Sequence, residues 1–149
     1  MKKLASVDYP EEMRNKPFFD LTVEMLNCVR DHNYHRLSEI CDDDFGIIDI
    51  NTEGGSEVIR DRAGWENWFQ SLFERLGAMG AQTWSEITNY EAIQRGDMGY
   101  CVVDFDQMLV VGDKNMRFAV LSTIIWKRDN GTWKESRYHC SLLNVREES

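Results

Sequence analysis

The chain has 149 residues, the size of one domain, and its hydrophobic content of 42% is enough for a sizeable core. Its formal net charge of −9 disfavours binding to nucleic acid or anionic lipid, because such surfaces are neutralised by clustered Lys and Arg. No run of about 18 apolar residues predicts a membrane-spanning helix. The basic start of the chain lacks the apolar segment of a signal peptide, so we expect a cytoplasmic protein.

The N-terminal residues 1–16 are polar and of mixed charge, and we expect them to form a flexible or docked arm. The rest of the chain, 17–149, is predicted to be a single domain. Its apolar residues first recur at helical spacing and predict a helix over 17–32, with Asn15 as the N-cap and Pro17 in the first turn.

A short second helix is expected over 34–41, and the charged run 42–44 is expected to break the chain before a strand over 45–50. A glycine-containing loop over 51–56 then leads to a brief returning strand at Val58 and Ile59. Asp61 is a favourable N-cap for a third helix, which we expect Gly77 and Gly80 to end. The apolar stripe of this helix consists of Trp65, Trp68, Phe69, Leu72, Phe73 and Leu76.

The second half of the chain is rich in β-branched and aromatic residues that are interrupted by turn signals. It predicts four antiparallel strands, over about 82–94, 98–111, 116–128 and 132–145. Helices and strands that are segregated in this way indicate an α+β fold, with a strongly twisted sheet that curls around one helical face.

Common catalytic and metal-binding signatures are absent from the sequence. It contains no nucleophile elbow and no phosphate-binding glycine loop, and its four cysteines form no C-x-x-C pair. We therefore expect reduced, buried thiols, no metal and no cofactor. Asp49, Asn51, Glu53 and Gly54 match part of a calcium loop, but Arg60 stands where that loop needs a bidentate glutamate.

Alternation along the strands divides their residues between two faces of the sheet. We assign to the pocket face Tyr100, Val102, Asp104, Asp106 and Met108 of one strand, Phe118, Val120, Ser122, Ile124 and Trp126 of the next, and Lys134, Ser136, Tyr138, Cys140 and Leu142 of the last. The opposite face of the last strand then carries Trp133, Glu135, Arg137, His139 and Ser141.

The C-terminal hairpin carries a family resemblance. The run from Trp126 to Trp133, with the segment Arg137-Tyr138-His139-Cys140-Ser141, resembles the last hairpin of the calcium/calmodulin-dependent protein kinase II association domain. Residues 38–42 are similar to the end of that domain's second helix, and the likeness extends over 18–145. The same nuclear-transport-factor-2-like superfamily includes SnoaL-like cyclases and ketosteroid isomerases.

This resemblance implies a cystatin-like cone, in which a strongly bent antiparallel sheet wraps over three N-terminal helices and encloses an open pocket. It also implies a homodimer through the outer sheet face, which would carry His139. Arginines line the pocket of the association domain, whereas the matching positions here are Asp104 or Asp106, Ile124 and Cys140. We therefore expect a small ligand that is not strongly anionic.

Two carboxylates are the first candidates for chemistry. A desolvated Asp104 would suit a general base, with Tyr138 polarising a carbonyl group; Asp106, His139 and Arg137 are alternatives. In the competing interpretation the aspartates lie in water and Tyr138 only packs. If the sheet faces are reversed, Arg137 and His139 line the pocket and the aspartates lie outside.

The sequence thus leaves two functions open. One is a small-molecule-binding domain that acts as a cofactor-free isomerase, cyclase or hydratase by proton transfer. The other is a non-catalytic dimeric module that binds a ligand or a protein. The residues expected to line the pocket are Trp65, Trp68, Tyr90, Tyr100, Asp106, Trp126 and Cys140.

Overall fold

The computed structural model describes residues 7–50 and 55–148, apart from the side chains of 46–50. The partial calcium-loop match and most of the expected loop over 51–56 lie outside the described residues. The helices are α1 (Glu11–Arg14), α2 (Phe19–Arg30), α3 (Tyr34–Ile40) and α4 (Arg62–Met79). The strands are β1 (Cys41–Ile50), β2 (Ser56–Ile59), β3 (Gln82–Arg95), β4 (Met98–Val111), β5 (Lys114–Asp129) and β6 (Thr132–Glu148).

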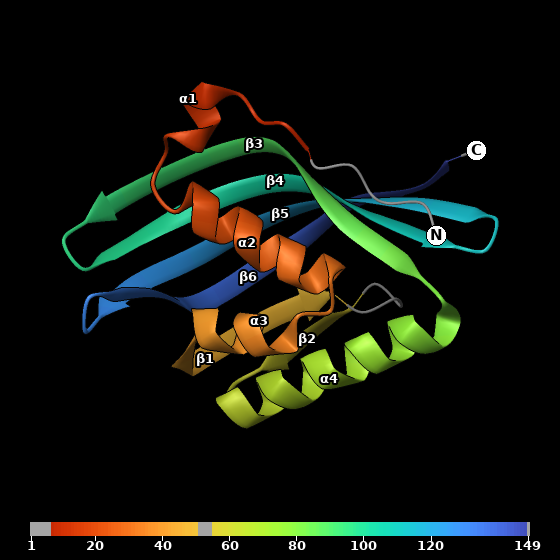
Figure 1. Cartoon of the computed structure of the whole chain (residues 1–149), viewed down its shortest axis with the longest axis horizontal. Coiled ribbons are helices and arrows are strands. Elements are labelled where there is room, and N and C mark those ends of the chain that lie inside the picture. Colours follow the sequence, from red (N-terminus) through yellow and green to blue (C-terminus); the bar gives the residue numbers. More distant parts are fainter. Residues whose placement is uncertain (1–6, 51–54, 149) are drawn as a thin grey trace.

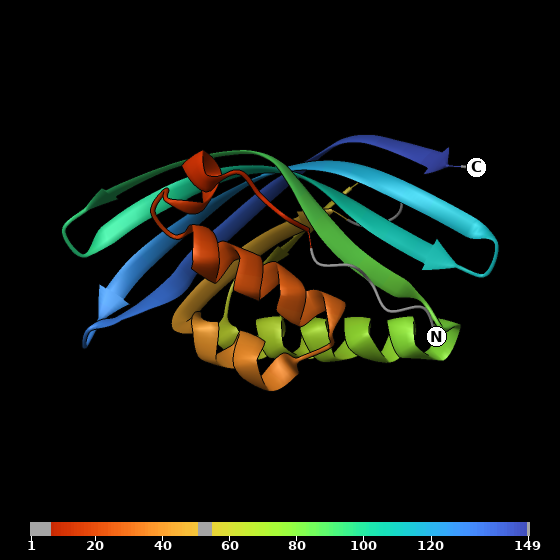
Figure 2. The same cartoon turned by 45° about the horizontal axis from the view of Figure 1, so that its top comes forward.

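One six-stranded sheet, in the order β2-β1-β6-β5-β4-β3, forms the body of the molecule. The strands β3 to β6 form an antiparallel meander, and β1 joins it by pairing parallel with β6. Figures 1 and 2 show the sheet bending over α2, α3 and α4, which all lie on its concave side. The predicted α+β class and bent sheet are therefore confirmed.

The charged run 42–44, expected as a break, is instead part of β1. Strand β1 begins at Cys41, which pairs with Glu135 of β6. Asp42 is buried there, and its Oδ2 lies 2.6 Å from Nζ of Lys127 on β5. This ion pair offsets the cost of burying the carboxylate, which lets an acidic residue stand inside the strand.

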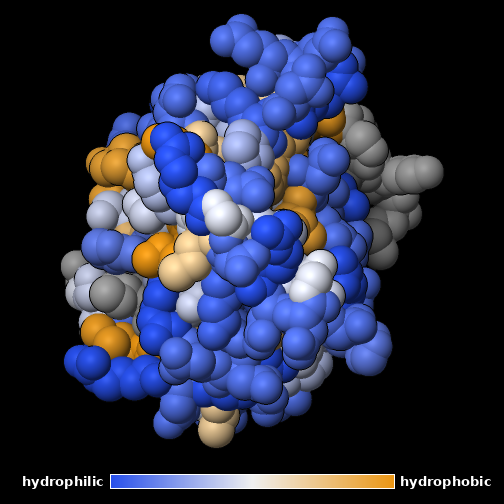
Figure 3. Space-filling view, turned by 90° about the vertical axis from the view of Figure 1, so that its left-hand side faces the viewer, coloured by the Kyte–Doolittle hydropathy of each residue, from blue (hydrophilic) through white to orange (hydrophobic). Residues whose placement is uncertain are grey.

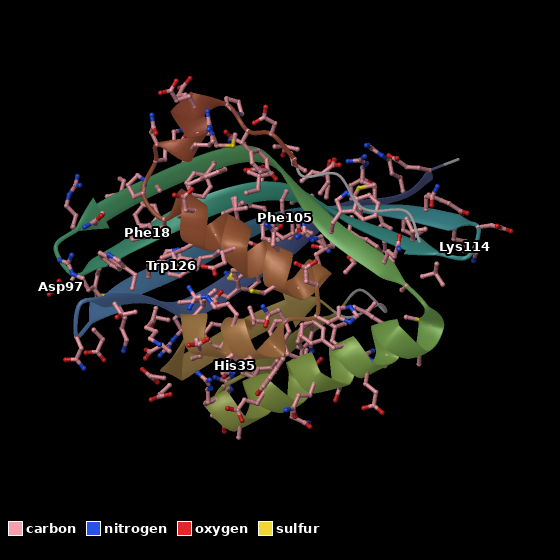
Figure 4. All side chains as sticks on the ribbon, in the orientation of Figure 1. Phe18, His35, Asp97, Phe105, Lys114 and Trp126 are labelled. Atoms are coloured by element: carbon pink, nitrogen blue, oxygen red, sulfur yellow. The ribbon has the colours of Figure 1, made fainter. Side chains whose placement is uncertain are left out.

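The start of α2 also differs from the prediction, because Asn15 does not cap it. The N-cap is Phe18, in the left-handed region at φ 62°. Its ring stacks on Trp126 at a centroid distance of 5.9 Å (Figure 4), and it meets Trp133 edge-on. A Cβ added to Gly99 would lie 2.5 Å from the Phe18 ring, so only glycine leaves room for this aromatic wedge.

The start of α4 follows the prediction, whereas its end lies later. The side chain of Asp61 accepts a hydrogen bond from the Gly64 amide at 2.8 Å, which confirms it as the N-cap. The helix continues through Gly77 and ends at Met79, where Gly80 adopts φ 63°. Gly80 alone therefore provides the left-handed C-cap.

Arg62, in the first turn of α4, joins three elements. Its guanidinium donates to the backbone carbonyls of Cys41 and Ser38, each at 2.8 Å, and lies over the Trp65 ring at 5.1 Å. These bonds tie the end of α3 and the start of β1 to α4. This role was not predicted, because backbone carbonyl acceptors leave no mark on residue type.

Candidate functional site

The two faces of β4 decide where the predicted site residues lie. Cys101, Val103 and Phe105 are buried against the helices, so Asp104 and Tyr100 belong to the opposite, outer face. Our assignment of β4 was therefore wrong by one residue. Because side chains alternate, that shift moves the whole strand to the other face. The apolar residues at alternate positions, Cys101, Val103 and Phe105, could have indicated the inner face of β4 from the sequence.

The proposed pair of Asp104 and Tyr138 is not brought together by the structure. Tyr138 points to the concave side, where its hydroxyl accepts a hydrogen bond from the buried Ser122 Oγ at 2.8 Å. Asp104 lies on the outer face opposite Leu121. Asp106 is half-buried on that face, and its Oδ2 lies 2.6 Å from Nη1 of Arg117.

The outer-face candidates on β6 have neighbours that we did not predict. Nη1 of Arg137 donates to the Asp44 carbonyl, and its Nη2 lies 3.2 Å from the Asp44 carboxylate. We expected Glu135 to share this face with Arg137 and His139, and that was wrong. A bulge between Ile125 and Trp126 shifts the register of β6, so that Glu135 pairs with Trp126.

Glu135 is the most unusual polar residue on the concave side. It is only 3% exposed, and burial raises the pKa of its carboxyl to about 8. Within the part of the chain that the structure describes, no hydrogen bond or ion pair to this carboxyl is present. Its neighbours on the adjacent strands are Trp126 and Cys41. Beyond the bulge, the next residue of β6 that faces inward is Tyr138.

Two thiols share the surroundings of this acid. Desolvation by burial raises the pKa of both Cys41 and Cys101, and a negative charge on Glu135 would raise both further as a smaller cause. Trp126 donates from Nε1 to the Cys101 sulfur at 3.4 Å. All four cysteines are buried and form no disulfide, and the raised pKa values keep the Cys41 and Cys101 thiols protonated.

Three of the predicted ligand-binding aromatics are fully buried. Trp65, Tyr90 and Trp126 all have zero exposure, and the Tyr90 hydroxyl donates to the Pro17 carbonyl at 2.6 Å. These residues belong to the hydrophobic core. Trp68 is half-buried, whereas Tyr100 is 41% exposed on the outer face.

The concave side is closed by buried side chains at one end and only partly buried at the other. Around Phe18 and Trp126 the inward side chains are buried or stacked, and Figure 3 shows mostly hydrophilic surface over this end of the molecule. Toward the other end, apolar side chains on the strands and on α4 remain half-exposed: Val120, Leu142, Trp68, Leu72 and Phe73. Tyr138 and Ser122 lie between these two regions, with Cys140 beside Ser122.

A separate apolar groove lies on the outer face, with a volume of about 540 Å³. It is lined by Ile93, Arg95, Met98, Gly99, Tyr100, Val102, Thr123 and Ile125. Ile93, Met98 and Tyr100 are exposed to solvent there. An exposed apolar surface of this kind is typical of a binding face rather than of an ordinary sheet surface.

Neither a metal-binding cluster nor a membrane-spanning helix is present within the described residues. No cluster of three or more His, Cys, Asp or Glu side chains is arranged to hold a metal ion there. None of the helices in 7–50 and 55–148 is long and apolar enough to span a membrane.

Solved structures with this fold come from several kinds of protein. They include the dehydrochlorinase LinA-type3 from Novosphingobium barchaimii, at 19% identity and TM-score 0.68, with 87% of this chain and 86% of that one covered. The β subunit of benzoate 1,2-dioxygenase from Burkholderia mallei is 14% identical, with TM-score 0.72 and coverage of 83% and 87%. An NTF2-like protein with a cystatin-like fold from Novosphingobium aromaticivorans is 15% identical, with TM-score 0.68 and coverage of 89% and 83%.

Sequence comparison is more restrictive. No curated protein matches the chain significantly. The sequence profile of the SnoaL-like domain, however, matches residues 20–144, which include all of α2 except its first residue, every element from α3 to β5, and most of β6. Together with the bent sheet over its helices, this match shows that the chain belongs to the SnoaL-like domain family.

Proposed function

We propose that this chain binds a small, uncharged, largely apolar molecule on the concave side of its sheet and moves a proton on it. The observation that carries the proposal is the buried Glu135 carboxyl, which has no protein partner in the described structure. Buried polar groups are normally satisfied, so an unpaired acid calls for an explanation. A bound ligand that hydrogen-bonds to this carboxyl supplies one.

The pKa of Glu135 suits acid–base chemistry. A group with a pKa of about 8 exchanges protons readily near neutral pH and can act as donor or acceptor. The pKa is raised by desolvation, so contact with a neutral ligand does not abolish the effect. In this proposal Glu135 takes the part that the sequence assigned to Asp104.

Tyr138 and Ser122 are the proposed binding groups for a carbonyl oxygen. Ser122 donates to the Tyr138 oxygen at 2.8 Å, and such a bond makes the phenol a stronger donor in its turn. The neighbouring strand residues Val103, Ile124 and Cys140 are uncharged, which favours a neutral ligand over an anion.

Hydrogen–deuterium exchange into small cyclic ketones in deuterated buffer, followed by proton NMR, tests the proposal without a known substrate. We expect Glu135→Gln to lower the exchange rate by about 10²- to 10⁴-fold while ketone binding persists. Asp104→Asn makes the same chemical change on the outer face and should leave the rate unchanged. Loss of exchange in Asp104→Asn but not in Glu135→Gln would reverse the assignment.

The outer groove supports a second function, assembly into a homodimer. Its exposed Ile93, Met98 and Tyr100 would be covered by the same face of a second copy, as in a self-complementary two-fold interface. We expect Tyr100→Glu to lower the mass measured by light scattering to that of a monomer. A mass equal to that of the wild type would argue against this face.

The reduced state of the four cysteines supports a place in the cytoplasm, which is part of the same proposal. All four are buried and form no disulfide, as is usual where cellular reductants keep thiols reduced.

A further inference from the structure

β3 is an edge strand of the sheet, so one row of its backbone groups lacks a neighbouring strand. It is 14 residues long, and a long edge is a template for pairing with another chain. In both views residues 7–18 begin beside this edge and then pass to the concave side (Figures 1 and 2), where Phe18 meets Gly99 of β4 and Trp126 of β5. The cover is therefore a segment of the same chain that adds no strand of its own.

Side chains of this segment form hydrogen bonds with backbone groups of β3 that a neighbouring strand would otherwise bind. The Ile87 amide donates to the Tyr9 hydroxyl at 3.1 Å, and Nζ of Lys16 donates to the Tyr90 carbonyl at 2.8 Å. Nζ of Lys16 also lies 3.4 Å from the Glu91 carboxylate. One backbone donor and one backbone acceptor of the edge are thus occupied, on either side of the β3 bulge that follows Ile87.

The segment is held mainly at its two ends. The Tyr9 ring meets Phe19 edge-on at 5.3 Å, and Phe18 is wedged against Trp126. Between these anchors no residue of α1 is fully buried, and only the partly buried Met13 packs against the core. A cover with so few fully buried residues is expected to open at a lower free-energy cost than the sheet beneath it.

We propose that residues 7–18 guard the β3 edge and that the partner they exclude is β3 of a second copy of this chain. Two identical edges pair antiparallel about a two-fold axis, which satisfies both rows of backbone groups and closes as a dimer. Every copy of the chain carries the same β3 edge, so a second copy offers a strand of identical length and sequence. This contact lies at the sheet edge and is distinct from the outer-face groove.

The double variant Tyr9→Ser/Lys16→Ser tests the guard, with hydrogen exchange at the Ile87 amide and mass by light scattering as readouts. In dilute solution we expect the Ile87 amide to exchange faster than in the wild type. As concentration rises, the mass should double relative to the wild type, and protection of Ile87 should return. The control Tyr34→Ser/Lys114→Ser removes the same residue types from sites that do not bond to β3 and should show neither change.

Two outcomes would overturn the proposal. Unchanged exchange at Ile87 would mean that the segment does not protect the edge. Faster exchange with the wild-type mass at every concentration would mean that the bare edge does not pair with a second copy. If the double variant fails to fold, Tyr9→Phe keeps the ring contact with Phe19, removes only the hydroxyl acceptor and is judged by the same two readouts.

Discussion

The two ends of the concave side differ in how they are built. At the closed end, the Phe18 ring fills the space that Gly99 leaves. The Arg62 guanidinium also ties α4 to α3 and β1 through two backbone carbonyls. Farther along the sheet, beyond the hydroxyl pair Ser122 and Tyr138, apolar side chains of the strands and of α4 are only partly buried. One end therefore carries most of the interlocking contacts, and Glu135 lies at that end, across from Trp126 and Cys41.

The largest expected loss of stability comes from Arg62→Met. The change keeps an apolar stem but removes the donors to Cys41 and Ser38, and hydrogen bonds from a charged donor contribute about 1.5–3 kcal/mol each. We expect the free energy of unfolding to fall by about 3 kcal/mol in urea titrations. Arg75→Met, on the exposed side of the same helix, is the control and should change little.

Gly99→Ala tests the aromatic wedge. The new Cβ would lie 2.5 Å from the Phe18 ring and 2.6 Å from the Ile93 carbonyl, and backbone cannot move aside cheaply. We expect a loss of about 2 kcal/mol, in the usual range for overpacking. The matched change Gly77→Ala meets nothing within 4 Å inside α4 and should be neutral or stabilising. Equal effects at the two sites would show that Phe18 yields readily.

Tyr138→Phe should have a small effect on stability, because it keeps the ring and removes only the hydroxyl group. It removes the hydrogen bond with Ser122, so we expect a loss of about 1 kcal/mol in thermal unfolding. The same variant should weaken ketone binding clearly in ligand-observed NMR. A large loss of stability with unchanged binding would instead make Tyr138 a structural residue.

The positions of the strands could be predicted closely from the sequence. The strands β3 to β6 lie within a few residues of their predicted bounds, because glycines at positive φ fix the turns: Gly96, Gly112 and Gly131. The pairing of β1 was less visible, since it needs Lys127 to neutralise Asp42 from a distant strand.

The candidate site was harder to predict, for a geometric reason. Both alternating rows of β4 contain large apolar residues, so Tyr100 and Phe105 give conflicting signals about the inner face. In β6 a single bulge moves Glu135 from the outer face to the inner one. Residue types alone do not show which face of a strand points inward, nor where a bulge occurs. An error in either one places the functional side chains on the wrong face of the sheet.

The central claim is that Glu135 is a buried acid that stays protonated near neutral pH. The folded-state pKa of about 8 lies above the ordinary value of about 4.3, so the unfolded chain loses its proton first as pH rises. This residue's contribution to stability is therefore full at low pH. It declines by about 1.4 kcal/mol per pH unit between the two pKa values and is lost once the pH passes about 8.

The most direct test is the free energy of unfolding of the wild type and of Glu135→Gln, measured in urea from about pH 5 to about pH 9. Glutamine keeps the shape of the acid and removes its titration, while Glu74→Gln on exposed α4 surface is the control. We predict that the wild type loses stability relative to Glu135→Gln as pH rises, with the difference levelling off above about pH 8. Parallel curves over the whole range would contradict the claim and remove the basis for proton transfer by this residue.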